Sequence, residues 1–126
     1  MKVRGSKEMV AAANAAVETI PVEKAIALAG DPNVVFVDVR EAVERQKGTI
    51  KGAVHAPRGY LEFHADPESP MHKPELASGK KLVLFCAAGA RSALAAKTLK
   101  DMGIANVAHI AGGFGAWQKA GGPTQS

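Results

Sequence analysis

Apolar positions along the chain form short continuous runs that alternate with helical patterns. Four runs predict strands, over residues 34–39, 54–57, 82–85 and 104–110. Because the run 82–85 is apolar at consecutive positions, both of its faces are expected to be covered, as in a parallel sheet with helices on each side. The β-branched run 34–39 is expected to be a central strand. This pattern predicts an α/β domain.

Helical patterns connect these strands. A surface helix is predicted to start near Ser6, segment 21–29 has proline in its first turn and glycine after its end, and segment 41–47 is expected to make one or two polar turns. Segment 92–102 is rich in strong helix formers. Its apolar stripe assigns four side chains to the buried face: Leu94, Ala95, Leu99 and Met102.

A last helix is predicted after Gly113 and carries Phe114 and Trp117. Their three-residue spacing is that of side chains that pack into a core. Segment 121–123, Gly-Gly-Pro, ends this helix, and the chain is expected to fray from there to Ser126.

Length and charge limit the possible functions. The 126 residues suit one domain, with a core over about 20–123 and an N-terminal extension over 1–19. The formal charge of +4 is dispersed, so small anions are compatible partners and nucleic acid is not expected. Glu8 and Asn14 interrupt the alanine-rich start, which favours a helix of a cytoplasmic protein over an export signal. No run reaches the ~20 apolar residues needed to cross a bilayer, so no membrane association is expected.

Cys86, the one cysteine, directly follows the predicted strand 82–85. Small residues come next, and the loop ends in arginine and serine: Ala87, Ala88, Gly89, Ala90, Arg91 and Ser92. Backbone N–H groups at a helix start can converge on one atom where small residues let the loop curl. We therefore predict that these N–H groups surround the Cys86 sulfur and favour a nucleophilic thiolate, with a buried structural cysteine as the alternative. A lone cysteine excludes an intramolecular disulfide and a cysteine-based metal cluster.

The segment 86–92 resembles the C-x-x-G-x-[RT]-S loop of rhodanese-like sulfurtransferases. Segments 37–41, 48–57 and 112–123 resemble further landmarks of that family, in the same order. The resemblance covers roughly residues 20–123 and implies a single rhodanese-like domain with a largely parallel, five-stranded sheet flanked by helices. It also implies that Cys86 carries a transferable sulfur as a persulfide, without a cofactor.

The expected reaction moves a sulfane sulfur from a small anionic donor, such as thiosulfate, to cyanide or a thiol, which can be a protein thiol. Two alternatives stay open: a sulfur carrier or regulatory binding module without turnover, and a cysteine-dependent phosphatase or arsenate reductase. The phosphatase loop has five residues between cysteine and arginine, whereas four residues separate Cys86 from Arg91. The oligomeric state is left open.

Other polar residues at the same predicted sheet edge are weaker candidates. Arg58 follows the strand 54–57 and is a candidate to bind an anionic substrate, with a solvated surface charge as the alternative. Asp38 and Arg40 fit a structural pair better than a substrate site. His55 is expected to be packed or hydrogen-bonded.

The segment 64–75 contains three prolines and is predicted to be an irregular loop that shapes the mouth of the substrate site. His64 and His72 lie in it, but no cysteine or nearby carboxylate completes a usual ligand spacing. No metal is therefore expected.

Overall fold

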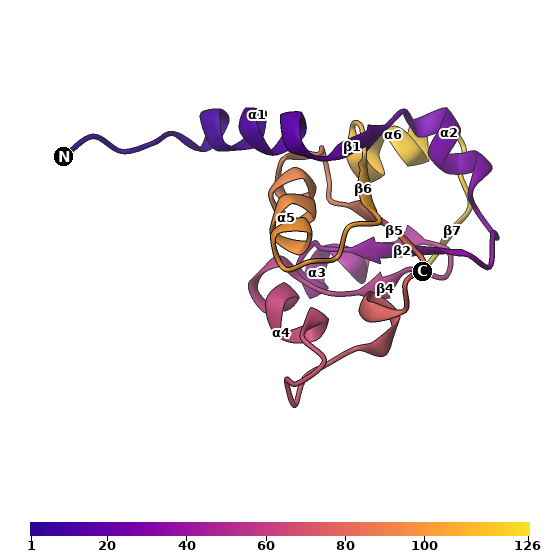
Figure 1. Cartoon of the computed structure of the whole chain (residues 1–126). Coiled ribbons are helices and arrows are strands. Elements are labelled where there is room, and N and C mark those ends of the chain that lie inside the picture. The colour runs from indigo at the N-terminus through magenta and orange to yellow at the C-terminus, as the bar shows by residue number, and fades with distance from the viewer.

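A computed structural model describes residues 1–126, and its centre is one five-stranded parallel sheet (Figure 1). The strands lie in the order β1-β6-β5-β2-β4, and every neighbouring pair is parallel. Their bounds are β1 Glu18–Ile20, β2 Val34–Asp38, β4 Val54–His55, β5 Lys81–Phe85 and β6 Val107–Ile110. The predicted α/β fold with a five-stranded parallel sheet is confirmed.

Helices cover both faces of this sheet (Figure 1). Their bounds are α1 Ser6–Ala16, α2 Val22–Ala27, α3 Ala42–Arg45, α4 Leu61–Ala65, α5 Ala90–Asp101 and α6 Gly113–Lys119, with single 3₁₀ turns at Arg58–Tyr60 and Pro74–Ala77. None of these helices has the length and apolar character needed to cross a membrane.

The side chains of β5 alternate between two apolar clusters, one on each face of the sheet. Leu82 and Leu84 pack with residues of α4 and α5, whereas Val83 and Phe85 pack with residues of α2 and α6. All four side chains are buried, because helices lie above and below the strand. The continuous apolar run in the sequence is therefore the signature of a strand covered on both faces.

Three strands were not predicted from the sequence. β1 is only three residues long, and two of them are polar, so it has no apolar run. β3 (Thr49–Ile50) and β7 (Thr124–Gln125) form a separate antiparallel pair. The prediction that the chain frays after Pro123 is therefore wrong, because β7 is anchored on β3 by backbone hydrogen bonds.

Two predictions about α5 also need correction. The helix begins at Ala90, two residues before the predicted start, and Gly89 precedes it with a φ of +116°. Met102, assigned to the buried face, is 41% exposed, because the helix has ended at Asp101 and the chain turns away at Gly103.

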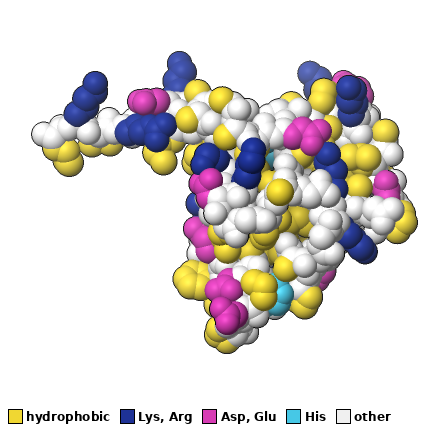
Figure 2. Space-filling view, in the orientation of Figure 1, with side chains coloured by type: hydrophobic (Ala, Val, Ile, Leu, Met, Phe, Trp, Pro, Cys, Tyr) yellow, Lys and Arg dark blue, Asp and Glu magenta, His cyan; other side chains and the backbone are white.

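The first five residues project away from the body of the molecule (Figure 1). Figure 2 shows Lys and Arg side chains along the N-terminal arm and over the upper and middle parts of the visible face, with Asp and Glu among them, whereas the lower end shows Asp and Glu alone.

Trp117 holds the α6 side of the core together. Its ring is fully buried and meets the Phe36 ring edge-on with centroids 5.4 Å apart, and its Nε1–H donates to the Pro123 carbonyl at 3.0 Å.

Trp117→Ala is expected to lower the free energy of unfolding by about 3–5 kcal/mol. Urea denaturation measures it. Met102→Ala, the matched control at an exposed position, should change it by no more than about 0.5 kcal/mol, and equal losses for both variants would contradict this description of the core.

Candidate active site

The sulfur of Cys86 lies at the carboxyl end of β5, beneath the first turn of α5. The Gly89 N–H donates to Sγ at 3.1 Å and the Ser92 N–H at 3.4 Å. The cysteine is only 2% exposed, whereas Ala87 and Ala88 on the rim of the loop are exposed. The loop therefore encloses one atom, as the small residues after Cys86 predict.

The start of α6 holds this loop from outside. The Phe114 N–H donates to the Cys86 carbonyl at 2.7 Å, and the Gly115 N–H donates to the Ala87 carbonyl at 3.1 Å. These bonds draw the carbonyl oxygens away from the sulfur and leave the inward positions to N–H groups. Two helix N-termini thus meet at Cys86, α5 at its sulfur and α6 at its backbone.

Gly113 makes this approach possible. Its φ is +61°, and a Cβ there would overlap the Cys86 carbonyl oxygen and lie 2.8 Å from the Ala87 carbonyl oxygen. Any other residue would be strained in this conformation and would also force the helix away from the loop.

Burial and hydrogen bonding act on Cys86 in opposite directions. Burial alone raises the pKa of the thiol, but hydrogen bonds from the Ser92 hydroxyl and from the amides of Ser92, Gly89 and Ala88 outweigh it. The pKa of Cys86 therefore lies below its ordinary value, and the thiolate is favoured. The other predicted loop residues, Ala87, Ala90 and Arg91, line the loop without a hydrogen bond to the sulfur.

Arg91 forms a two-pronged ion pair with Glu44 on α3. Nη1 lies 2.7 Å from Oε1, and Nη2 lies 3.0 Å from Oε2. Hydrogen bonds from Arg91 lower the pKa of Glu44 to about 2, and the pair raises the pKa of Arg91. The guanidinium closes the loop against α3, so it is engaged by a carboxylate of the protein itself.

Asp38 and Arg40 form the buried frame of the same sheet edge. Arg40 donates to Asp38 from Nε at 3.0 Å and from Nη2 at 2.9 Å, and Nη2 also donates to the Gly48 carbonyl at 2.7 Å. The Thr49 hydroxyl donates to the same carboxylate at 2.8 Å. This network ties β2 to β3, and the guanidinium stacks 4.4 Å from the centre of the Phe114 ring. Both charged side chains are bound by other groups of the protein, so the pair has a structural role.

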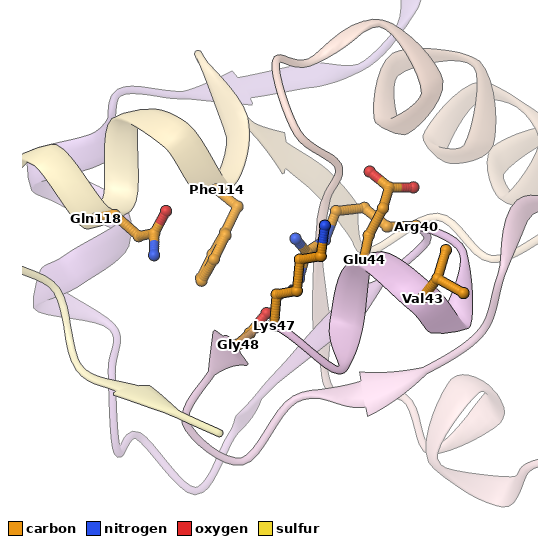
Figure 3. A pocket seen from close by; sticks show the side chains of 7 residues that line it. All are labelled: Arg40, Val43, Glu44, Lys47, Gly48, Phe114 and Gln118. Atoms are coloured by element: carbon orange, nitrogen blue, oxygen red, sulfur yellow. The ribbon is translucent and has the colours of Figure 1, made fainter.

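A cleft of about 330 Å³ lies between α3 and α6, next to the cysteine loop (Figure 3). Phe114 and Gln118 of α6 line one side, and the other side is formed around α3. The full lining is Arg40, Val43, Glu44, Lys47, Gly48, Phe114 and Gln118. Glu44 connects the cleft to Arg91, and the Phe114 amide connects it to Cys86.

Arg58 is not brought to the cysteine loop, which corrects its assignment as a substrate-binding residue. Pro57 ends the short extended segment and a 3₁₀ turn begins at Arg58, so the side chain turns toward α4 and α5. Its guanidinium donates to Glu62 at 3.0 Å and to the Thr98 hydroxyl at 3.1 Å. Thr98 follows Ser92 by six residues, about 9 Å along the helix axis.

The histidines outside this site have structural partners. His55 Nε2 contacts the Arg40 carbonyl oxygen at 2.8 Å, His64 Nδ1 contacts the Met71 carbonyl oxygen at 2.9 Å, and His72 Nδ1 contacts the His64 carbonyl oxygen at 3.0 Å. No group of three or more His, Cys, Asp or Glu side chains is placed to hold a metal ion.

The Rhodanese-like domain family matches residues 21–120. The chain belongs to this family. A tRNA uridine(34) hydroxylase from Mesorhizobium japonicum is 37% identical over 89 residues, which are 70% of this chain and 28% of that protein. This chain spans less than half the length of several curated relatives that it matches, from 28% to 46%.

Two solved structures match nearly the whole rhodanese-like chain. One, from Rhodopseudomonas palustris, is described as a protein of unknown function and possible tyrosine phosphatase; it is 50% identical, covers 99% of this chain and 97% of its own, and has a TM-score of 0.94. The other is a polysulfide-sulfur transferase homodimer from Wolinella succinogenes, 31% identical, which covers 94% of this chain and 85% of its own with a TM-score of 0.71.

Sequence reasoning missed two parts of this rhodanese-like site. The role of Gly113 as the contact between α6 and the cysteine loop depends on a packing that the sequence does not reveal, although two adjacent glycines before a helix are a signal of a close approach. The second part is His109, which contacts the Ser92 hydroxyl at 2.9 Å. Its signal is a histidine inside the otherwise apolar strand Val107–Ile110.

Gly113→Ala is expected to lower the free energy of unfolding by at least ~1–2 kcal/mol, the cost of a left-handed conformation, and to reduce the reactivity of Cys86 toward iodoacetamide as the loop opens. Gly115→Ala in the same helix is the control, because its Cβ would lie 3.4 Å from the Ala87 carbonyl oxygen at an ordinary φ. Thermal unfolding and alkylation rates measure both effects. Wild-type behaviour of Gly113→Ala would refute the role of α6 in holding the loop.

Proposed function

We propose that this rhodanese-like domain is a sulfurtransferase that carries a sulfane sulfur on Cys86. One observation carries the proposal: the Cys86 sulfur lies at the base of a loop that aims N–H groups at it and lowers its pKa. A thiolate in this place is a nucleophile, and the same N–H groups stabilise it again when it is released as the leaving group of the second step.

The reaction has two displacements. The Cys86 thiolate attacks the outer sulfur of the donor, thiosulfate for example, so that a new S–S bond forms and the donor's S–S bond breaks. The electron pair of the broken bond leaves with sulfite. An acceptor, cyanide or a thiolate, then attacks the outer sulfur of the persulfide, and the electron pair of that S–S bond returns to Cys86. No cofactor is required for either step.

The loop suits a single sulfur atom better than a tetrahedral anion. Gly89 and Ser92 donate directly to Sγ, so the ring of amides is closed around one atom. The outer sulfur of the persulfide then lies at the exposed rim formed by Ala87 and Ala88. The cleft between α3 and α6 carries the positive charge of Lys47 and contacts the loop through Glu44 and the Phe114 amide.

The similar protein from Rhodopseudomonas palustris is described as a possible tyrosine phosphatase, which makes a phosphatase the second candidate. In a cysteine-dependent phosphatase, the arginine that ends the loop must be free to bind phosphate oxygens. Here both prongs of the Arg91 guanidinium are bound by Glu44, and four residues separate Arg91 from Cys86. Both features favour sulfur transfer over phosphate hydrolysis.

The test compares wild-type protein with Cys86→Ser in thiosulfate:cyanide sulfurtransfer. We expect ping-pong kinetics for the wild type and a loss of at least about a thousandfold in turnover for Cys86→Ser, because a hydroxyl is a far weaker nucleophile. Thr98→Ala, which removes a partner of Arg58 outside the loop, is the control and should retain turnover.

An aryl phosphate assay separates the two candidates. The wild-type protein is expected to leave p-nitrophenyl phosphate unhydrolysed. Efficient hydrolysis together with no sulfur transfer from thiosulfate, polysulfide or another sulfane donor would replace this proposal by the phosphatase. Uptake of one sulfur without turnover on any acceptor would instead indicate a sulfur carrier.

A further inference from the structure

A chain of hydrogen bonds leads from the Cys86 sulfur through the interior to the surface. Sγ lies 3.5 Å from the Ser92 hydroxyl, which lies 2.9 Å from His109 Nδ1. His109 Nε2 lies 2.8 Å from Asn14 Oδ1 and 3.2 Å from the Thr19 hydroxyl. Ser92 and His109 are buried, whereas Asn14 and Thr19 are exposed.

The position of His109 is unusual for a buried strand residue. β6 lies between β1 and β5, and its other residues, Val107, Ala108 and Ile110, are apolar and buried. His109 is 2% exposed and has a hydrogen-bond partner at each ring nitrogen. Burial lowers the pKa of its imidazole and so favours the neutral ring.

A neutral imidazole has one donor and one acceptor nitrogen, so the hydrogen bonds from Cys86 to Asn14 can all point in either of two directions. In one direction the Cys86 thiol donates to the Ser92 oxygen, the Ser92 hydroxyl donates to Nδ1 of His109, and Nε2–H donates to Asn14. In the other direction Nδ1–H donates to the Ser92 oxygen, the Ser92 hydroxyl donates to the thiolate, and Nε2 accepts from the Thr19 hydroxyl and from the Asn14 amide, which turns its N–H toward the ring. The second arrangement holds one proton fewer, which leaves to solvent from the Nε2 side, so it belongs to the ionised sulfur.

We propose that His109 is a positioning residue that changes its tautomer when Cys86 ionises, and thereby turns the Ser92 hydroxyl toward the sulfur anion. This role rests on the proposed sulfur transfer, because the same hydroxyl then stabilises the thiolate that attacks the donor and that returns after each transfer. The tautomer decides whether the hydroxyl donates to the imidazole or is free to donate to the sulfur anion, for which the Gly89 carbonyl at 3.2 Å is the uncharged competing acceptor.

The N-terminal helix contributes to the hydrogen bonds of His109. Asn14 lies on α1, which precedes the family match over residues 21–120, and Thr19 lies on β1, also outside it. Both residues approach the same ring nitrogen from the side away from Cys86. The segment before the family match therefore supplies the outer partners of His109.

The charged groups near the sulfur are not part of the chain of hydrogen bonds from Cys86 to Asn14. Arg91 on α5 acts electrostatically on Cys86, and it is paired with Glu44 on α3. The groups that contact His109 come from α1, β1 and α5, and they are the uncharged side chains of Asn14, Thr19 and Ser92. The ionisation to which His109 responds is therefore that of Cys86.

Nitrogen NMR of the ¹⁵N-histidine-labelled wild-type protein tests the tautomer directly. As pH rises through the ionisation of Cys86, the proton on the His109 ring is expected to move from Nε2 to Nδ1. His55, His64 and His72 are internal controls, because each ring contacts a backbone carbonyl, which only accepts and cannot turn, whereas the side-chain amide of Asn14 can present either its oxygen or its N–H to His109. In Cys86→Ser, His109 should keep one tautomer across the same pH range.

Alkylation of Cys86 by iodoacetamide, followed against pH, tests the consequence for the sulfur. Ser92→Ala should raise the midpoint by about one to two pH units, the effect of one hydrogen bond to a charged group. His109→Leu should raise it by a few tenths of a unit up to about one unit, since it acts only through the serine. In the Ser92→Ala background, His109→Leu should add no shift, and His72→Gln should leave the wild-type midpoint unchanged.

Either of two results would overturn the proposal: an unchanged His109 tautomer in the wild-type protein, or equal shifts by His109→Leu with and without Ser92. The first measurement needs no variant that might misfold. Both follow the ionisation of Cys86 without any sulfur donor, so a protein that shows the tautomer change but transfers no sulfur would contradict only the proposed function.

Discussion

The two hydrogen bonds from the start of α6 to the Cys86 and Ala87 carbonyls constrain the whole site. A loop of small residues has no preference of its own for turning its amides inward. Because α6 binds the carbonyl oxygens from outside, the amides that remain face the sulfur, and α5 can begin directly above it. Gly113 permits this contact, and the parallel sheet brings both helix starts to the same edge.

Ion pairs keep the neighbouring elements in register with this loop. The buried pair of Asp38 and Arg40 holds β2, β3 and the Phe114 ring together, and the pair of Arg91 and Glu44 connects α5 to α3. Each arginine near the site is therefore bound within the protein. The sulfur anion depends on aligned amides and one hydroxyl for its stabilisation, and Arg91 acts on it as a more distant charge.

Local signals predicted much of this from sequence. The apolar run of β5, the lone cysteine after it and the small residues up to Ser92 determine a strand, a loop and a helix start from neighbouring residues alone. β1 could not be found in this way, since its pairing with β6 joins residues about 90 positions apart, for example Thr19 and His109. β7 likewise exists only through its pairing with β3.

The direction in which a side chain points was the other feature that could not be predicted from the sequence. Arg58 follows a strand that ends at the correct edge of the sheet, but the 3₁₀ turn that begins there sends its guanidinium to Glu62 and Thr98. His109 gave the opposite result: it lies in a plain apolar strand, and only the packing of α1 and α5 on that strand connects it to Ser92 and Asn14. A histidine in an apolar strand is a local signal, but its partners follow only from the tertiary structure.

Intact mass spectrometry of the protein after treatment with thiosulfate tests the central claim most directly. The account predicts that the wild-type chain gains the mass of one sulfur atom, that cyanide or a thiol removes it, and that Cys86→Ser gains none. A wild-type chain that gains no sulfur from thiosulfate or polysulfide while Cys86 is readily alkylated, or a Cys86→Ser chain that gains as much as the wild type, would contradict it.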